Sequence, residues 1–422
     1  MKEVARLISG DGRCVVVLSA MSGTTNRLLG ISSLLLRSNK EEARQLLHTL
    51  KADYAAVIDE LYDSAATATK AREITDAIFA DLLAITDAGP NEYSERETVA
   101  RGELLSTNLM KLLLDEMEVS AALLPALDFM KTDIHGEPDF PFIREHAAKA
   151  VAAHPEARVL LTQGFICRNA EGGIDNLRRG GSDYSASLIG AAINADLIEI
   201  WTDIDGMHDN DPRFVENTSP VHNLHFDEAA ELAYFGAKIL HPTCILPAKE
   251  NNIPVRLLNT MEPDAEGTLI DNNLRKGTIK AVAAKDNITA IKIKSGRMLL
   301  AYGFLKKVFE VFERYEKPID MITTSEVGVS VTIDNETHLA EIVEELHRYG
   351  SVSVDRDMVI ICVVGDLQWR NRGFEALALD ALADLPVRMI SYGGSNYNIS
   401  FLVEKENKTE ALRRLSNHLF KN

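Results

Sequence analysis

The sequence has few cysteines and no long apolar run. Its four cysteines, Cys14, Cys167, Cys244 and Cys362, are spread over 422 residues, and none belongs to a C-x-x-C pair. A disulfide-stapled secreted scaffold or a zinc site needs closer spacing, so we expect a protein of the reducing cytoplasm. No stretch reaches the roughly 20 apolar residues of a membrane helix. The N-terminus also lacks the continuous apolar core of a signal peptide.

Positive charge is scarce as well. Lys and Arg number 45 against 63 Asp and Glu, which gives a formal net charge of −18. This balance argues against a nucleic-acid partner and against docking on an anionic membrane. Hydrophobic residues make up 46% and charged residues 26% of the chain, which excludes a disordered protein. At about 150 residues per domain, the length suggests two or three domains.

Three familiar motifs of phosphate and acyl chemistry are missing. The sequence contains no G-x-x-x-x-G-K-[ST], no G-x-G-x-x-G and no G-x-S-x-G. A P-loop enzyme, a dinucleotide fold, a protein kinase and a nucleophile elbow are therefore disfavoured. If this protein binds a phosphate group, a different arrangement of residues must hold it.

An alternation of strands and helices is present up to about residue 277. Continuous apolar runs followed by small residues predict strands that are buried on both faces, as in a parallel sheet. The alternation favours an α/β fold, a three-layer α/β/α sandwich with helices on both faces of the sheet. We expect strands at 14–19, 159–162, 196–201 and 253–258, and helices at 2–9, 27–87, 94–118, 184–193 and 226–239.

The units become shorter after residue 277 and follow the ferredoxin-like order βαββαβ twice. The second copy lacks its last strand, which the segment 278–284 could supply. We therefore predict domains at 1–277, at 278–357 (with 278–286 donated to the last domain) and at 358–422. The expected strands are 288–293, 319–322, 327–333, 352–359, 358–364, 387–392 and 398–403, with helices at 304–315, 339–349, 374–382 and 409–420.

Three polar clusters follow or adjoin the predicted strands, where open α/β sheets bind ligands. Residues 19–26 are small and hydroxylated, although a plain strand-to-helix turn would look the same. Residues 177–186 combine glycines, two arginines and Asp183, which suits an anion together with an ammonium group or a metal. Residues 201–213 are acidic but lack the EF-hand spacing, and Thr202 and Arg213 suit a nucleotide.

Taken together, the clusters resemble the amino-acid kinase superfamily and, within it, aspartate kinase. The ferredoxin-like repeats are similar to the paired ACT regulatory domains of that family, with Ile322–Val327 as the telling motif. The matching kinase segments are 17–26, 102–106, 163–166, 179–184, 201–203, 211–213 and 235–242.

The resemblance implies a role for each matching residue, and no residue is assigned to a metal. Arg179, Asp183 and Lys238 would be catalytic. The aspartate site would contain Thr25, Glu103, Arg179, Ser182 and Asp183, with Arg179 on the α-carboxylate. The nucleotide would contact Thr202, Asp203, His208, Arg213 and Lys238. An effector amino acid would contact Met298, Gly303, Phe304, Leu305, Asp320, Thr324 and Ser325.

The implied reaction is phosphorylation of the L-aspartate β-carboxylate by ATP with Mg²⁺, the first step toward lysine, threonine and methionine. The implied regulation is feedback by lysine or threonine in a cytoplasmic homodimer joined through its ACT domains. The substrate carboxylate is already a nucleophile, so positioning and charge neutralisation would supply the catalysis.

Aspartate kinases open with a Lys-Phe-Gly-Gly-Thr-Ser strand that this sequence does not contain. We expect a form extended upstream by such a strand to be more stable and more active, because the strand carries phosphate contacts. The alternatives are a catalytically impaired truncated chain, an amino-acid-sensing pseudokinase, or a kinase for glutamate or N-acetylglutamate. The paired ACT units argue against the last of these.

Overall fold

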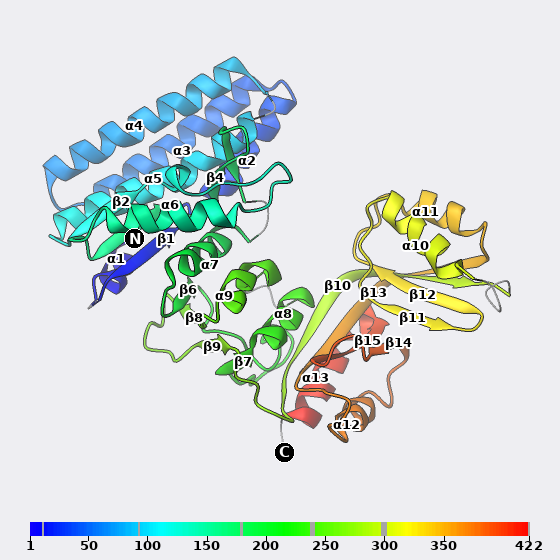
Figure 1. Cartoon of the computed structure of the whole chain (residues 1–422). Helices are drawn as coiled ribbons and strands as arrows, with labels where there is room; N and C mark the ends of the chain where they lie inside the picture. The colour runs from blue at the N-terminus through cyan, green and yellow to red at the C-terminus, as the bar shows by residue number, and fades with distance from the viewer. Residues whose placement is uncertain (11, 92, 178–179, 237–240, 297–301, 421–422) are drawn as a thin grey trace. The chain divides into compact units, whose positions relative to one another are not determined.

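The computed structural model describes residues 1–422 except 11, 92, 178–179, 237–240, 297–301 and 421–422 (Figure 1). The chain divides into two units, Met1–Asp203 with Thr243–Ala265, and Ile204–Pro242 with Glu266–Asn422. In the described part of the chain, no helix combines the length and the apolar character that crossing a membrane requires.

The first unit contains a parallel sheet between two helical layers. Its sheet has the order β1-β3-β2, and β3 pairs in parallel with both neighbours. The side chains of Val159 and Leu161 on β3 join the core under α2 to α5, whereas Leu160 joins the core under α6 and α7. This alternation creates the expected three layers.

The first unit begins with a mainly helical part and continues with shorter strands and helices. They are α1 (Lys2–Ile8), β1 (Cys14–Leu18), α2 (Thr24–Leu36), α3 (Lys40–Leu61), α4 (Ala65–Ala88), α5 (Ser94–Glu116), β2 (Ala121–Leu124), α6 (Phe140–Ala152), β3 (Val159–Gln163), β4 (Ile166–Arg168), β5 (Ile174–Asn176), α7 (Gly181–Ile193), β6 (Ile198–Thr202), α9 (Leu246–Glu250) and β8 (Val255–Asn259), with short 3₁₀ turns at Ala126–Asp128 and Pro242–Ile245.

The second unit is dominated by one antiparallel sheet with the order β11-β12-β10-β13-β15-β14. Its elements are β7 (Asn223–His225), α8 (Phe226–Tyr234), β9 (Thr268–Asp271), β10 (Ile279–Lys294), α10 (Phe304–Arg314), β11 (Ile322–Ser325), β12 (Gly328–Ile333), α11 (Leu339–Leu346), β13 (Ser351–Gly365), α12 (Phe374–Ala381), β14 (Val387–Tyr392), β15 (Asn398–Glu404), a 3₁₀ turn at Lys405–Asn407 and α13 (Lys408–Leu419).

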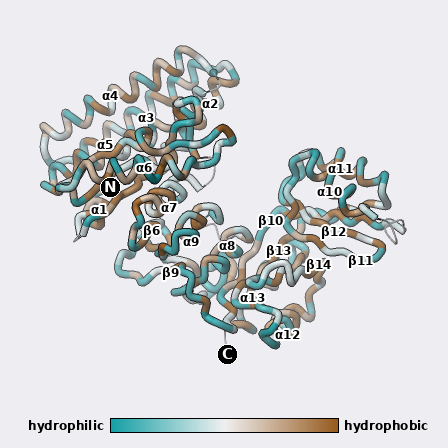
Figure 2. The backbone as a smooth tube through the Cα atoms, viewed as in Figure 1, coloured by the Kyte–Doolittle hydropathy of each residue, from teal (hydrophilic) through white to brown (hydrophobic). Residues whose placement is uncertain are grey.

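Two long strands connect the repeated halves of this sheet. The first part of β10 pairs with the second part of β13, from Ile279 opposite Gly365 to Lys285 opposite Ile360. The second part of β10 pairs with β12 and with the first part of β13. Each half has its own apolar core, one under α10 and α11 and the other under α12 and α13. The tube in Figure 2 is brown along much of the central strands.

Four local predictions were wrong. The strand β1 is half-buried and not fully buried, because it lies at the end of its three-stranded sheet. The helix expected at 226–239 ends at Tyr234, where Gly236 has a φ of 117°. The strand expected at 319–322 begins only at Ile322, which is opposite Val331. The two strands expected at 352–364 form one continuous strand, β13.

Candidate active site

The carboxyl ends of β1 and β3 place two small-residue loops side by side. Leu18 is opposite Gln163 in the parallel pair, and the Gly164 N–H donates to the Leu18 carbonyl at 2.9 Å. The loop after β1 carries Ser19, whose hydroxyl donates to the Ser182 hydroxyl at 2.8 Å. Ser182 lies in the first turn of α7, so this helix begins at the edge of the sheet.

Close backbone contact sets the position of α7. A Cβ on Gly164 would lie 2.8 Å from the Ser182 Cα and 2.3 Å from its Oγ, so only glycine fits. The neighbouring Phe165 has a φ of 66°, an uncommon value outside glycine, and its N–H donates to the Ser185 hydroxyl. The N-terminus of α7 is thereby fixed against β3, where its free N–H groups favour an anion.

Glu103 contributes a buried carboxylate to this edge. It lies on α5, is 3% exposed, and its Oε1 accepts the Ala20 N–H at 3.2 Å. Its Oε2 is buried and has no hydrogen-bond partner among the described residues. Burial raises the pKa of Glu103 to about 7, although the Ala20 N–H acts in the opposite direction. An unpartnered buried carboxylate oxygen is costly unless a ligand ammonium group completes its hydrogen bonding.

Asp183 is the second acidic group of the site. It lies in the first turn of α7, and burial raises its pKa to about 6. Thr25, in the first turn of α2, is half-buried and follows Gly23, whose φ is 78°. An acid beside a helix N-terminus can meet both charges of a zwitterionic amino acid, because the carboxylate accepts from the ammonium group and the helix N–H groups donate to the carboxylate.

The structure brings four of the predicted aspartate-site residues to one region, and the fifth lies outside the described residues. Glu103 lies within α5, and the first turns of α2 and α7 contain Thr25, Ser182 and Asp183. Arg179 and Lys238 belong to the residues that are not described, so their roles stay predictions. Sequence analysis placed Ser19 in the polar cluster at 19–26 but assigned it no individual role in the aspartate site.

The predicted nucleotide residues divide between the two units. Thr202 ends β6, which pairs in parallel with β8, and the exposed Asp203 follows it. In the second unit, the His208 ring contacts Asp205 at 2.9 Å and Thr218 at 2.8 Å, so both ring nitrogens are already engaged. The exposed Arg213 forms a two-point ion pair with Asp211.

The predicted effector residues lie around α10 and β11. Gly303 precedes α10 with a φ of 77°, Phe304 is buried, and Leu305 is 37% exposed. Thr324 and Ser325 are exposed on β11. Met298 lies outside the described residues.

Asp320 is already paired inside the protein. Its side chain is 2% exposed. Its Oδ1 accepts from the Lys285 ammonium at 2.6 Å and from the Tyr234 hydroxyl at 2.8 Å. Its Oδ2 is buried and has no partner among the described residues. An effector ammonium at this carboxylate would therefore meet an internal cation.

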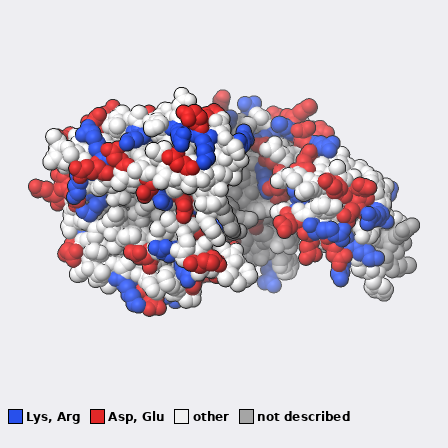
Figure 3. Space-filling view, turned by 90° about the horizontal axis from the view of Figure 1, so that it is seen from above, with Lys and Arg blue, Asp and Glu red and all other residues white. Residues whose placement is uncertain are grey.

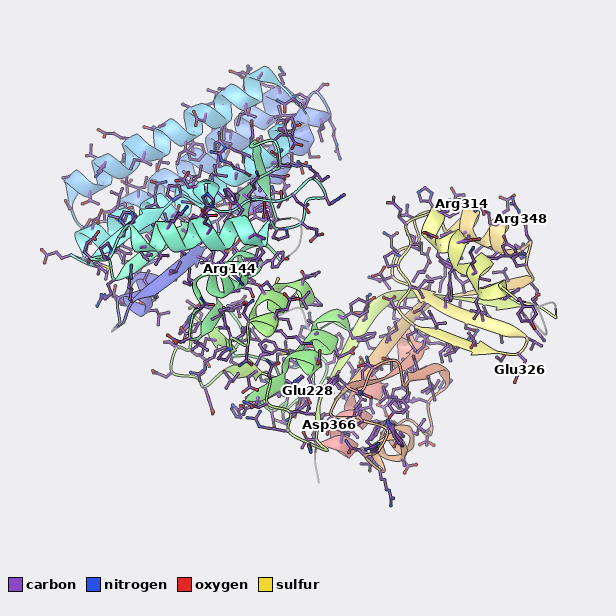
Figure 4. All side chains as sticks on the ribbon, in the orientation of Figure 1. Arg144, Glu228, Arg314, Glu326, Arg348 and Asp366 are labelled. Carbon is purple, nitrogen blue, oxygen red and sulfur yellow. The ribbon has the colours of Figure 1, made fainter. Side chains whose placement is uncertain are left out.

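Charged side chains on the rest of the surface form local pairs. Positive and negative groups are interspersed on the face drawn in Figure 3. Arg314 of α10 pairs with Glu345 of α11 (Figure 4). Glu228 of α8 and Asp366 are instead two buried acidic side chains, and burial and the like charge of Asp366 both raise the pKa of Glu228. Within the described residues, no group of three His, Cys, Asp or Glu side chains could hold a metal ion.

Comparison with known proteins gives consistent matches over the whole chain. The model of the amino acid kinase family matches residues 1–259, and the model of an ACT domain matches residues 361–419. The lysine-sensitive aspartokinase 3 of Escherichia coli is 32% identical over 100% of this chain and 96% of its own length. The chloroplastic aspartokinase 3 of Arabidopsis thaliana is 32% identical over 100% of this chain and 79% of its own length.

Two solved structures of the Escherichia coli aspartokinase III are similar to the fold. The complex with aspartate and ADP (R-state) matches with a TM-score of 0.85 at 32% identity. The complex with lysine and aspartate (T-state) matches with a TM-score of 0.81. Both matches cover 100% of this chain and 96% of the solved one.

Proposed function

Since the chain belongs to the amino acid kinase family and, within it, to the aspartokinases, we propose that it phosphorylates the β-carboxylate of L-aspartate with ATP. The observation that carries this proposal is the buried Glu103 carboxylate, whose unpartnered oxygen lies at the sheet edge where α7 begins. The product, 4-phospho-L-aspartate, would be the first intermediate toward lysine, threonine and methionine.

The residues of the site bind and orient the substrate. Glu103 accepts the α-ammonium group, and Arg179 pairs with the α-carboxylate in a charge-assisted contact. Thr25 and Ser182 supply hydroxyl groups, and the N–H groups of α7 face developing negative charge. A carboxylate oxygen of aspartate bonds to the γ-phosphorus while the bond from that phosphorus to the ADP oxygen breaks, so no general base is required.

Thr202 and Asp203, which end and follow β6, would contact the nucleotide. The nucleotide roles of His208, Arg213 and Lys238 stay predictions. Mg²⁺ supplies charge neutralisation on the phosphates when it is bound. Lys238 would neutralise charge on the transferred phosphoryl group.

Turnover tests this proposal directly. We expect the full chain with ATP and Mg²⁺ to form an acyl phosphate from L-aspartate, which hydroxylamine traps as a hydroxamate. L-Glutamate should react poorly because its carboxylate lies one methylene further from the ammonium group. N-Acetyl-L-aspartate should also react poorly because it lacks the cation that Glu103 accepts. ATP hydrolysis that is indifferent to aspartate would contradict the assignment.

We further propose that the chain is a homodimer and that its regions 278–357 and 358–422 are ACT domains, with 278–286 part of the second. An effector amino acid would bind at Gly303, Phe304, Leu305, Thr324 and Ser325, with Met298 and Asp320 nearby. The helix α10 begins there and offers N–H groups to a carboxylate. Lysine is the first candidate and threonine the second.

Calorimetric titration should distinguish these effectors. We expect heat from L-lysine and less heat from L-norleucine, which has a similar length but no side-chain ammonium group. Such a difference would require the ligand ammonium group to replace the Lys285 ammonium, which contacts Asp320 at 2.6 Å. Equal heats from the two ligands would show that Asp320 does not bind the side-chain ammonium group of the effector. Heat from threonine alone would identify threonine as the effector.

A further inference from the structure

A buried tyrosine links the outer helices of the first unit to the first turn of α2. Tyr54 lies on α3 and is 1% exposed. Its hydroxyl forms a hydrogen bond with the Thr24 hydroxyl, with an O–O distance of 3.0 Å. Its ring packs edge-on against Phe79 of α4, with 5.8 Å between the ring centroids. The ring therefore has a fixed position, and the hydroxyl fixes Thr24.

Thr24 occupies a tightly packed point beside Glu103. It is the first residue of α2 and is 2% exposed. A Cβ on Gly102 of α5 would lie 3.4 Å from the Thr24 methyl group and 2.8 Å from the Ala20 Cβ. The glycine thus lets α5 approach the loop closely enough for Glu103 to accept the Ala20 N–H.

The charge of Glu103 also affects the pKa of the Tyr54 hydroxyl. Burial raises the pKa of Tyr54 to about 12, and the Glu103 carboxylate adds to that rise. The phenol is therefore neutral at physiological pH and serves only as a hydrogen-bonding group. Because Thr24 and Tyr54 are both buried, loss of their bond would leave a polar atom without a partner next to the substrate region.

We propose that Tyr54 is a positioning residue for aspartate, which holds the first turn of α2 and its Thr25 at a fixed distance from Glu103. The hydroxyl does not touch the substrate. It acts through Thr24, because Thr25 is the next residue in the same helical turn. This inference rests on the proposed function and adds to it a residue from the outer helical layer.

The test is the Tyr54→Phe variant of the full chain. We expect KM for aspartate to rise about fivefold, which is the equilibrium effect of one ordinary hydrogen bond. KM for ATP and kcat should stay within about twofold, because the tyrosine contacts neither the nucleotide nor the reacting atoms. A tyrosine that served stability alone would leave all three constants unchanged in the folded fraction.

Tyr62→Phe provides a matched control. Tyr62 directly follows α3, is 6% exposed, and donates its hydroxyl to the Leu109 carbonyl of α5 at 2.7 Å. The two variants each lose one buried hydroxyl bond, so similar losses of Tm are expected. Only Tyr54→Phe should change KM for aspartate. An equal rise in KM in both variants would overturn the positioning role.

The Thr24→Val variant tests whether Tyr54 affects KM for aspartate through its hydrogen bond to Thr24. Valine keeps the branched shape of threonine and removes the hydroxyl group. We expect it to raise KM for aspartate about as much as Tyr54→Phe does, and the double variant should add little, because both changes remove the same bond. Fully additive effects on KM would overturn the proposed route through Thr24.

The outcomes separate this inference from the proposed function. If the unaltered chain neither phosphorylates nor binds aspartate, the proposed function fails and the positioning role fails with it. If the unaltered chain is active and Tyr54→Phe has an unchanged KM for aspartate, only the positioning role is overturned. Calorimetric binding of aspartate to each variant provides the same comparison without turnover.

Discussion

Replacing Glu103 with glutamine is expected to lower kcat/KM for aspartate about a hundredfold. The substitution keeps the size of the side chain and removes the charge that receives the substrate ammonium group. Losing one partner of a buried charge pair costs about 2–5 kcal/mol, and each 1.4 kcal/mol corresponds to a factor of ten. Steady-state kinetics with aspartate as the varied substrate would measure the loss.

Glu116→Gln is the control for this variant. Glu116 lies on the same helix, α5, and its carboxylate accepts the N–H groups of Asp63 and Ser64. The control removes a carboxylate charge that is less buried and lies far along the helix from Glu103. It should lower stability and leave kcat/KM unchanged. If kcat/KM fell by the same factor in Glu116→Gln, Glu103 would affect activity indirectly, through the stability of the fold, and not by contacting the substrate.

The pH dependence gives a second test of Glu103. Its pKa is raised from 4.5 to about 7, so ionisation in the free enzyme is complete only above neutral pH. We expect kcat/KM for aspartate to rise as the pH increases through about 7, and this limb of the profile should disappear in Glu103→Gln.

The stability of the protein should change in the opposite sense. The raised pKa contributes stability that is fully present below 4.5 and is lost as the pH rises through about 7. Glu103→Gln should therefore be more stable relative to the unaltered chain at pH 8 than at pH 5. Urea unfolding of both proteins at the two pH values would measure the difference.

Replacing Lys285 with methionine is expected to lower the free energy of unfolding by about 3–5 kcal/mol, because it leaves the Asp320 carboxylate buried without a cation. The Lys285 ammonium lies 2.6 Å from Asp320 and 2.9 Å from Asp334, and it lies above the ring of Tyr234. Burial alone would lower the pKa of Lys285, but the two carboxylates more than offset this, and the pKa is raised.

Lys306→Met is the matched control for Lys285→Met. Lys306 pairs with Glu310 at 3.5 Å, and its side chain is 78% exposed. An exposed pair contributes at most about 1 kcal/mol, so urea unfolding should detect little change. The double variant Lys285→Met with Asp320→Asn should recover part of the lost stability, since the uncompensated charge is gone. If Lys285→Met and Lys306→Met lost similar amounts of unfolding free energy, the burial of the Lys285–Asp320 pair would not explain its contribution to stability.

The local pattern of the sequence was sufficient to predict the architecture of the chain. The apolar run at 159–162 predicted β3, and the alternation of strands and helices predicted layers on both faces of a sheet. Small polar residues after strands indicated where a ligand would bind, because the carboxyl ends of parallel strands meet at one edge. Such features depend on residues close together in the chain, so they can be recognised without the tertiary structure.

Contacts between distant residues were decided only by the tertiary structure. The Tyr54–Thr24 bond joins residues 30 positions apart, and the Lys285–Asp320 bond joins residues 35 apart. The start of β11 at Ile322 depends on its pairing with β12, and the raised pKa of Glu103 depends on burial under other elements. Strand register and desolvation are properties of the packed chain, because each is set by the residues that pack against a side chain and not by its sequence neighbours.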